Sequence, residues 1–181
     1  MTNSPPLVID ACVLLNLLAT DRFEDILVYL EREILVCSIV SDEVYYLKSY
    51  DKPGERGLIK IQPYIDIGIL LNCHIEDSEV ELLVNLSSQL DEGEAMSLAI
   101  AISREFDIAT DDKKALRVFR EAGGDEIKIH STLSLIRDWA ESRNISEVDL
   151  QHILKRIKEM ANYIPRKTDS NYLWWDKMIS D

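Results

Sequence analysis

Short apolar runs that alternate with amphipathic segments constrain the fold of this chain more than any other feature of its sequence. The runs predicted as buried strands are residues 7–10, 34–37, 68–75, 107–110 and 127–131. The segments predicted as helices are residues 12–18, 21–32, 39–48, 78–88, 91–105, 112–122, 133–143 and 146–162. No hairpin signal joins two of the strands, so their order indicates a mainly parallel sheet covered by helices.

The composition is that of a globular protein without a membrane segment. Hydrophobic residues make up 46% of the 181 residues and charged residues 29%, which excludes a largely disordered chain. No apolar run reaches the about 18 residues that a membrane span needs. Asp10 interrupts the apolar stretch near the N-terminus, so we expect no signal peptide there. Cys12, Cys37 and Cys73 lack metal-ligand spacing and are predicted to be buried thiols of a reducing cytoplasm.

Acidic residues follow the ends of several predicted strands. Asp10 ends the first strand, and Asp111 and Asp112 follow the fourth. Glu43 lies about one helical turn after the second strand, and Glu94 lies in the first turn of the helix that precedes the fourth. Ligands of parallel α/β sheets bind beyond the carboxyl ends of the strands. We therefore expect these five carboxylates to converge on one edge of the sheet.

Most of these acids also have a purely structural interpretation. Asp10 is suited to cap the helix that follows it. Asp91 and Glu94 have the spacing of a capping box, in which Asp91 would be the N-cap. One of Asp111 and Asp112 is suited to an N-cap and the other to the first turn, where the helix dipole favours acids. Both interpretations of each residue remain open at this point.

Glu43 presents the clearest conflict between charge and surroundings. The predicted helix over residues 39–48 places Val40 and Tyr46 one turn before and after it. A carboxylate among apolar neighbours is costly unless it meets a cation or hydrogen-bond donors. A solvated helix face is the alternative for Glu43, and Asp42 is the better candidate for simple solvation.

A cluster of carboxylates calls for a cation. Like charges within a few ångströms repel, and a divalent ion would neutralise them. All the candidate ligands are oxygens, which select Mg²⁺ or Mn²⁺ over Zn²⁺. The histidines show no paired spacing, and neither a Walker loop nor a GxGxxG motif is present. Because carboxylate-held Mg²⁺ usually serves phosphoryl chemistry, a phosphodiester is the substrate that this pattern favours.

Four blocks of the sequence resemble those of a known family. They are LVIDACVLL, SIVSDEVYYL, DEGEAMSLAIAIS and DIATDDKKALRVF, in this order over residues 7–119. As a set they resemble the PIN domain of VapC-type toxin ribonucleases from toxin–antitoxin pairs. The DEGEA and TDDKKA forms are most similar to a bacterial and archaeal branch of these proteins.

The resemblance implies a fold, an activity and a set of site residues. The fold would be a three-layer α/β/α sandwich, and the activity a Mg²⁺- or Mn²⁺-dependent endoribonuclease that activates water against RNA. The acidic quartet would be Asp10, Glu43, Glu94 and Asp112, with Asp111 beside it. Relatives are commonly dimers that a cognate antitoxin neutralises. Cys12 stands where many relatives carry Ser or Thr.

The resemblance further divides the chain into a nuclease domain over residues 1–142 and a C-terminal extension over residues 143–181. The extension is predicted to be an amphipathic helix followed by an aromatic tail. Residues 155–168 hold five basic residues and one acid, a net charge of +4. The extension either packs on the domain or contacts RNA, an antitoxin or a second copy.

The net charge of −13 is compatible with a nucleic-acid substrate. Residues 76–112 contain eleven acids and one base, so this stretch carries most of the excess. We expect metal-assisted engagement of RNA rather than tight binding by the protein alone. Two other functions fit the same residues: a DNA nuclease, because nothing identifiable reads a 2′-OH, and a catalytically silent PIN-like module that binds a protein partner.

Overall fold

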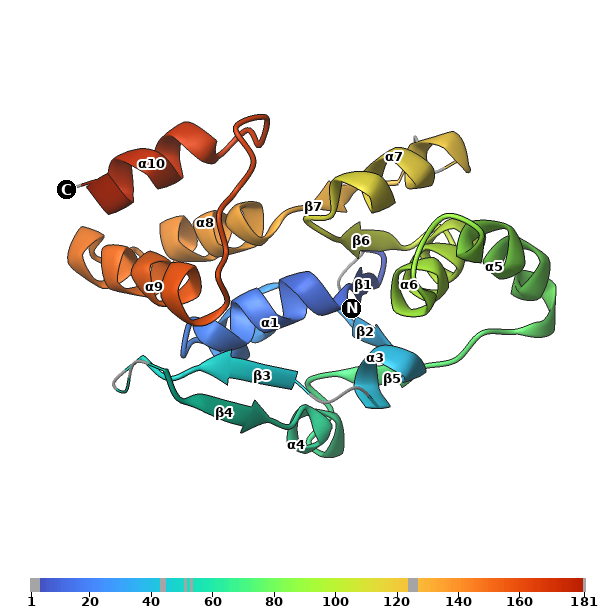
Figure 1. The fold of residues 1–181 in the computed structure, drawn as a ribbon, viewed down its shortest axis with the longest axis horizontal. Coiled ribbons are helices and arrows are strands. Elements are labelled where there is room, and N and C mark those ends of the chain that lie inside the picture. Colours follow the sequence, from blue (N-terminus) through green and yellow to red (C-terminus); the bar gives the residue numbers. More distant parts are fainter. Residues whose placement is uncertain (1–3, 43–44, 51, 53, 124–126, 181) are drawn as a thin grey trace.

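The computed structural model describes residues 4–42, 45–50, 52, 54–123 and 127–180, and it contains a central five-stranded sheet (Figure 1). The strand order is β5-β2-β1-β6-β7, and all four pairings are parallel. The strands are β1 (Leu7–Ile9), β2 (Ile34–Cys37), β5 (Leu71–Cys73), β6 (Asp107–Ala109) and β7 (Ile129–His130). The predicted α/β/α sandwich with a mainly parallel sheet is confirmed.

Two groups of helices flank the sheet (Figure 1). One group packs around α1 and consists of α1 (Ala11–Ala19), α2 (Phe23–Tyr29), α8 (Thr132–Ser142) and α9 (Glu147–Met160). The other packs around α6 and consists of α5 (Val80–Ser87), α6 (Glu92–Ser103) and α7 (Lys113–Glu121). The three residues of β1 are fully buried between the groups, as the central strand of such a sandwich requires.

The predicted helix over residues 39–48 is wrong in its second half. Helix α3 spans only Ser38–Asp42, and β3 (Tyr45–Lys48) pairs antiparallel with β4 (Arg56–Ile59). Tyr45 and Leu47 are buried whereas Tyr46 is 57% exposed. This alternation has the period of a strand, and the apolar cluster was consistent with either period. The expected absence of hairpins is therefore also wrong.

Two helices lie where the sequence pattern predicted none, and they are α4 (Gln62–Asp66) and α10 (Tyr172–Ser180). The helix predicted over residues 78–88 begins as the 3-10 turn η1 (Asp77–Glu79) and continues as α5. Helix α10 contains the aromatic residues expected as a tail, and its Trp175 is 4% exposed. None of the helices in the described parts of the chain is long and apolar enough to cross a membrane.

Helix α9 packs on the domain through its apolar face. Leu150, Ile153, Leu154 and Ile157 are buried in the same core as β1 and α1. Arg156 reinforces the contact, because its Nε donates to the Ala19 carbonyl at 3.1 Å. The C-terminal extension is thus held against the α1 side of the sheet (Figure 1).

A partly buried ion pair joins η1 to the end of α6, since Glu79 is buried and the Arg104 side chain is 22% exposed. Arg104 donates from Nε to Glu79 Oε1 at 2.6 Å and from Nη2 to Glu79 Oε2 at 2.8 Å. The Glu76 amide donates to the same carboxylate at 2.8 Å. Burial alone would raise the pKa of Glu79, but the bonds from Arg104 and Glu76 outweigh it and hold that pKa below its ordinary value.

We expect Glu79→Gln to lower the free energy of unfolding by about 1–3 kcal/mol at pH 7, because it removes a charged hydrogen-bond acceptor from Arg104. The depressed pKa means that this contribution is complete above the unfolded-state pKa of Glu and is lost as pH falls through the folded-state value. Urea unfolding at pH 7 and at acid pH measures the difference. Glu81→Gln, on an exposed site of α5, is the matched control. A difference that grows on acidification would contradict this assignment.

Candidate active site at the carboxyl edge of the sheet

Asp10 is a buried carboxylate at the point where β1 ends. Its side chain is only 3% exposed. Oδ1 accepts from the Ala11 amide at 2.8 Å, and Oδ2 accepts from the Thr110 hydroxyl at 2.9 Å and from the Cys12 thiol at 3.1 Å. Burial raises the pKa of Asp10, and these donors oppose that rise. Asp10 does cap α1, as one interpretation of the sequence held, but it also links β1 to β6.

Asp111 and Asp112 follow β6 and have different surroundings. Asp111 accepts from the Thr132 amide at 3.1 Å, from the Thr132 hydroxyl, and from Asn16 Nδ2 at 3.2 Å. Burial raises the pKa of Asp111 despite these donors. Asp112 is the N-cap of α7, and its Oδ1 accepts from the amides of Lys114 and Ala115, both at 2.7 Å. Its Oδ2 accepts no hydrogen bond from the described residues.

Glu94 has the fewest hydrogen-bond partners of the four described site acids, Asp10, Glu94, Asp111 and Asp112. Asp91 caps α6 by accepting from the Glu94 amide at 2.9 Å, which is one half of the expected capping box. Among the described residues, no return bond from the Glu94 carboxylate to Asp91 completes that box. Partial burial, together with the nearby charges of Asp91, Asp112 and Asp10, raises the pKa of Glu94 to about 7. The Glu94 carboxylate is therefore not needed for capping and is poorly compensated in charge.

The acids meet at one pocket, with a volume of about 390 Å³. Glu94, Asp111 and Asp112 line it together with Cys12 and Asn16 of α1. The wall opposite is formed by residues 161–164, which follow α9. Asp10 does not line the pocket but adjoins it, since its Oδ2 accepts from the thiol of the lining residue Cys12. The structure thus brings Asp10, Glu94, Asp111 and Asp112 to one edge of the sheet, whereas Glu43 lies outside the described residues.

The helical argument for the surroundings of Glu43 is not supported. It relied on Tyr46 lying one turn further along a helix, but Tyr46 belongs to β3 and is exposed. The sequence position of Glu43 indicates only that it directly follows α3, a helix that contacts α6.

The donor set suits a hard divalent cation by its chemistry. Every candidate is a carboxylate. Burial raises the pKa of Asp10 and Asp111, and burial together with the neighbouring acids Asp91, Asp112 and Asp10 raises that of Glu94. Within the described residues, no three His, Cys, Asp or Glu side chains meet in a metal-ligating arrangement. Glu94 and Oδ2 of Asp112 are the carboxylate groups of the pocket that accept no hydrogen bond within the described parts of the chain.

Sequence reasoning missed the residues that position these acids. Thr110, at 0% exposure, binds Asp10 through its hydroxyl and accepts from the Asp112 amide at 3.2 Å. Asn16 binds Asp111 and Thr132. Asn16 left a signal, because it is the one polar residue within the apolar run of α1. Tyr163 left none, since it follows α9 and reaches the pocket only through the tertiary fold.

A family model agrees with this geometry. The model DUF3368, described as a PIN domain, matches residues 6–173. The chain belongs to the PIN domain family. PIN domains are generally nucleases and typically use divalent metal ions. The match continues past α9 and so includes the wall of the pocket formed by residues 161–164. No curated protein and no solved structure shows significant similarity to the chain.

We expect Thr110→Val to destabilise this PIN domain by about 1–3 kcal/mol, because the buried Asp10 carboxylate and the Asp112 amide each lose a partner while the volume stays the same. Thr110→Ser keeps the hydroxyl and is the matched control. Urea unfolding of the three proteins measures the effect. If valine were as stable as threonine, Thr110 would have no role in holding Asp10.

Proposed function

We propose that this PIN domain is a Mg²⁺- or Mn²⁺-dependent endoribonuclease, the toxin of a toxin–antitoxin pair of the VapC type. The observation that carries the proposal is the carboxylate cluster at the edge of the sheet, where Glu94 has a pKa raised to about 7 and few partners. Nuclease activity is general in the family. RNA as the substrate and the toxin role rest on the resemblance of the four sequence blocks.

The proposed metal ligands are Asp10, Glu94 and Asp112, joined by Glu43. A bound Mg²⁺ or Mn²⁺ would lower the pKa of an attacking water and neutralise phosphate oxygens. Asp10 is suited to ligation because Thr110, Cys12 and Ala11 fix its orientation. Glu94 is suited because its side chain has no competing structural bond in the described residues.

Asp111 takes a supporting place in this proposal. Both of its oxygens accept hydrogen bonds, from Thr132 and Asn16, whereas Asp112 keeps Oδ2 without such a bond. Asp112 is therefore the preferred ligand of the two. Both oxygens of Asp10 also accept hydrogen bonds, so its place among the proposed ligands rests on the resemblance of the sequence blocks. Asp111 would tie α1 to α8 and hold the turn in which Asp112 lies, in the way that outer partners orient metal ligands.

Replacement of Asp10 by Asn or of Glu94 by Gln is expected to abolish RNA cleavage while the protein stays folded. The loss should exceed the about 10- to 100-fold that removal of an outer-shell partner costs, because a ligand itself is removed. Cleavage of a labelled RNA in Mn²⁺, together with circular dichroism, measures both properties. Glu92→Gln, an exposed acid on the same helix, is the control. Metal-dependent cleavage by both site variants would refute the proposal.

A catalytically silent protein-binding module is the second candidate. It is favoured by the structural work that Asp10 and Asp112 already perform as caps of α1 and α7. Calorimetric titration with Mn²⁺ separates the two candidates. The nuclease predicts heat of binding for the natural protein and its loss in a Glu94→Gln/Asp112→Asn variant. No heat at millimolar metal would favour the silent module.

The choice of RNA over DNA and the partners need their own tests. Cleavage of an oligonucleotide with a single ribonucleotide among deoxynucleotides would reveal dependence on the 2′-OH. A DNA nuclease with the same site would cut an all-deoxy strand equally well. A second copy and a small antitoxin protein are the partners that the toxin role requires.

A further inference from the structure

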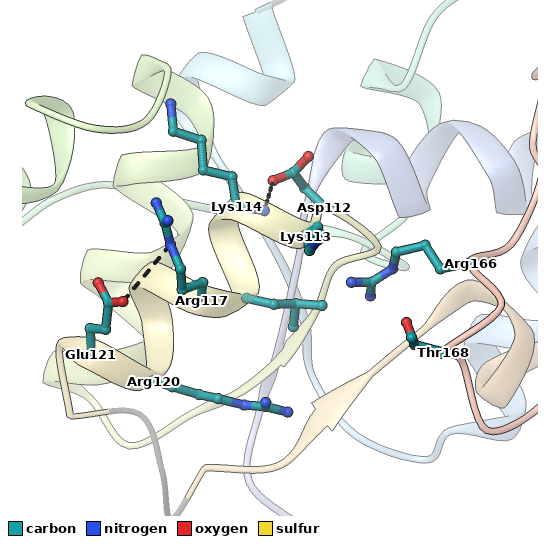
Figure 2. Close-up of a pocket in the computed structure, with 9 residues that line it drawn as sticks. Asp112, Lys113, Lys114, Arg117, Arg120, Glu121, Arg166 and Thr168 are labelled. Carbon is teal, nitrogen blue, oxygen red and sulfur yellow. Dashed lines mark hydrogen bonds and ion pairs between the residues drawn. The ribbon is translucent and has the colours of Figure 1, made fainter.

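A basic groove begins at the acidic pocket and runs along α7 (Figure 2). Its volume is about 900 Å³, and Asp112 lines both the groove and the acidic pocket. Its basic lining residues are Lys113, Lys114, Arg117, Arg120 and Arg166. Asp112 and Glu121 are the acids of the lining, so its net charge is +3 in a chain whose net charge is −13.

The two walls of the groove come from distant parts of the chain. Helix α7 forms one wall, and the segment between α9 and α10 forms the other with Arg166 and Thr168. Figure 2 shows Arg166 extending toward α7, and Arg120 extending from α7 toward the opposite wall. The segment is anchored just before Arg166, since Tyr163 is buried and its amide donates to the Ile157 carbonyl at 3.2 Å.

Most cations of the groove are not neutralised by the protein. Arg117 pairs with Glu121 at 3.8 Å, one turn along α7. Lys113, Lys114, Arg120 and Arg166 form no ion pair within 4 Å among the described residues. Cations that face each other without counter-charges favour an anionic ligand, and a phosphate chain supplies several negative charges in a row.

We propose that this groove binds the phosphodiester backbone of the substrate strand next to the cleavage point. The proposal rests on the proposed function, because it takes the acidic pocket as the place of cleavage. A strand whose phosphate lies at Asp112 continues into the groove without leaving the surface, since both sites share that residue. Leu116 gives the groove an apolar surface for sugar or base, and Thr168 adds a hydroxyl beside Arg166.

This groove also accounts for a polyanionic substrate on a strongly acidic protein. The cluster of Asp10, Glu94 and Asp112 repels phosphate unless a cation is bound. Basic residues that flank the cluster would hold the neighbouring phosphates and leave one phosphate at the acids. The residues that position the strand are thus Lys113, Arg120 and Arg166, none of which belongs to the proposed metal ligands.

The test measures binding of a mixed-sequence single-stranded RNA by fluorescence anisotropy at several salt concentrations. EDTA is present to prevent metal-dependent cleavage. We expect Arg120→Gln/Arg166→Gln to weaken binding on the order of tenfold at low salt. The slope of log K against log salt should fall by about 1.4, since each phosphate contact on a single strand contributes about 0.7. Arg143→Gln/Lys177→Gln is the control, because it removes the same charge from exposed sites outside the groove.

Equal affinity and slope in the two double variants would overturn the groove, as would absence of RNA binding by the natural protein. If the groove variant loses binding to polyglutamate but binds RNA like the natural protein, the groove is a site for an acidic protein segment, and the proposal is also overturned.

Kinetics separate this proposal from the proposed function. With metal present, the groove variant should raise KM for RNA while kcat, and cleavage of a small phosphodiester too short to enter the groove, stay unchanged. If the natural protein cleaves RNA and the groove variant does so with the same KM, the groove proposal is refuted and the nuclease proposal is retained. RNA binding that depends on the groove, without cleavage by the natural protein, would refute the nuclease and leave the groove standing.

Discussion

The hydrogen bond from Thr110 to Asp10 is the contact on which the candidate site depends. Strands β1 and β6 pair in register up to Ile9 and Ala109, so the next residue of each strand emerges at the same level. The Asp10 amide donates to the Ala109 carbonyl at 3.0 Å, and the Thr110 hydroxyl donates back to the Asp10 carboxylate. A buried carboxylate is costly without such donors. The parallel pairing therefore supplies the bond that makes an acid tolerable at this place, and α1 and α7 begin from it.

This dependence explains why the centre of the fold and site was predictable. A buried parallel strand reads as a short apolar run, and an acid directly after it falls at the carboxyl edge whatever the details of packing. Asp10, Asp111 and Asp112 needed only this rule. Glu94 needed one more step, the helical spacing that places it on the same stripe as Leu98, which is fully buried. The competing structural interpretations were also right for Asp10 and Asp112, because each caps a helix through one oxygen. The other oxygen of Asp10 binds Thr110 and Cys12, whereas that of Asp112 accepts no hydrogen bond from the described residues.

The rest depended on contacts that no local pattern contains. The apolar pattern of Tyr45–Lys48 was consistent with both the helical and the strand period, and pairing with β4 decided for the strand. Helix α10 has no strong start signal, and its order comes from packing of Trp175 and its neighbours on α9. Tyr163 and Arg166 reach the site because α9 lies along α1 and returns the chain to the carboxyl edge. Tyr163 and Arg166 lie more than 50 residues after Asp112 in the sequence, so no local sequence pattern indicates that they line the same site.

The distribution of charge, rather than its sum, determines what this protein is able to bind. The stretch that is richest in acids, residues 76–112, ends at Asp112, and α7 begins directly after it with Lys113 and Lys114. One residue therefore lies at the boundary between a negative centre and a positive groove. A cation neutralises the first and an anion the second, so a metal ion and a phosphate chain would each reduce the repulsion that the other meets. If the protein binds both, their binding would be mutually favourable, and by linkage each would raise the affinity of the protein for the other by the same factor.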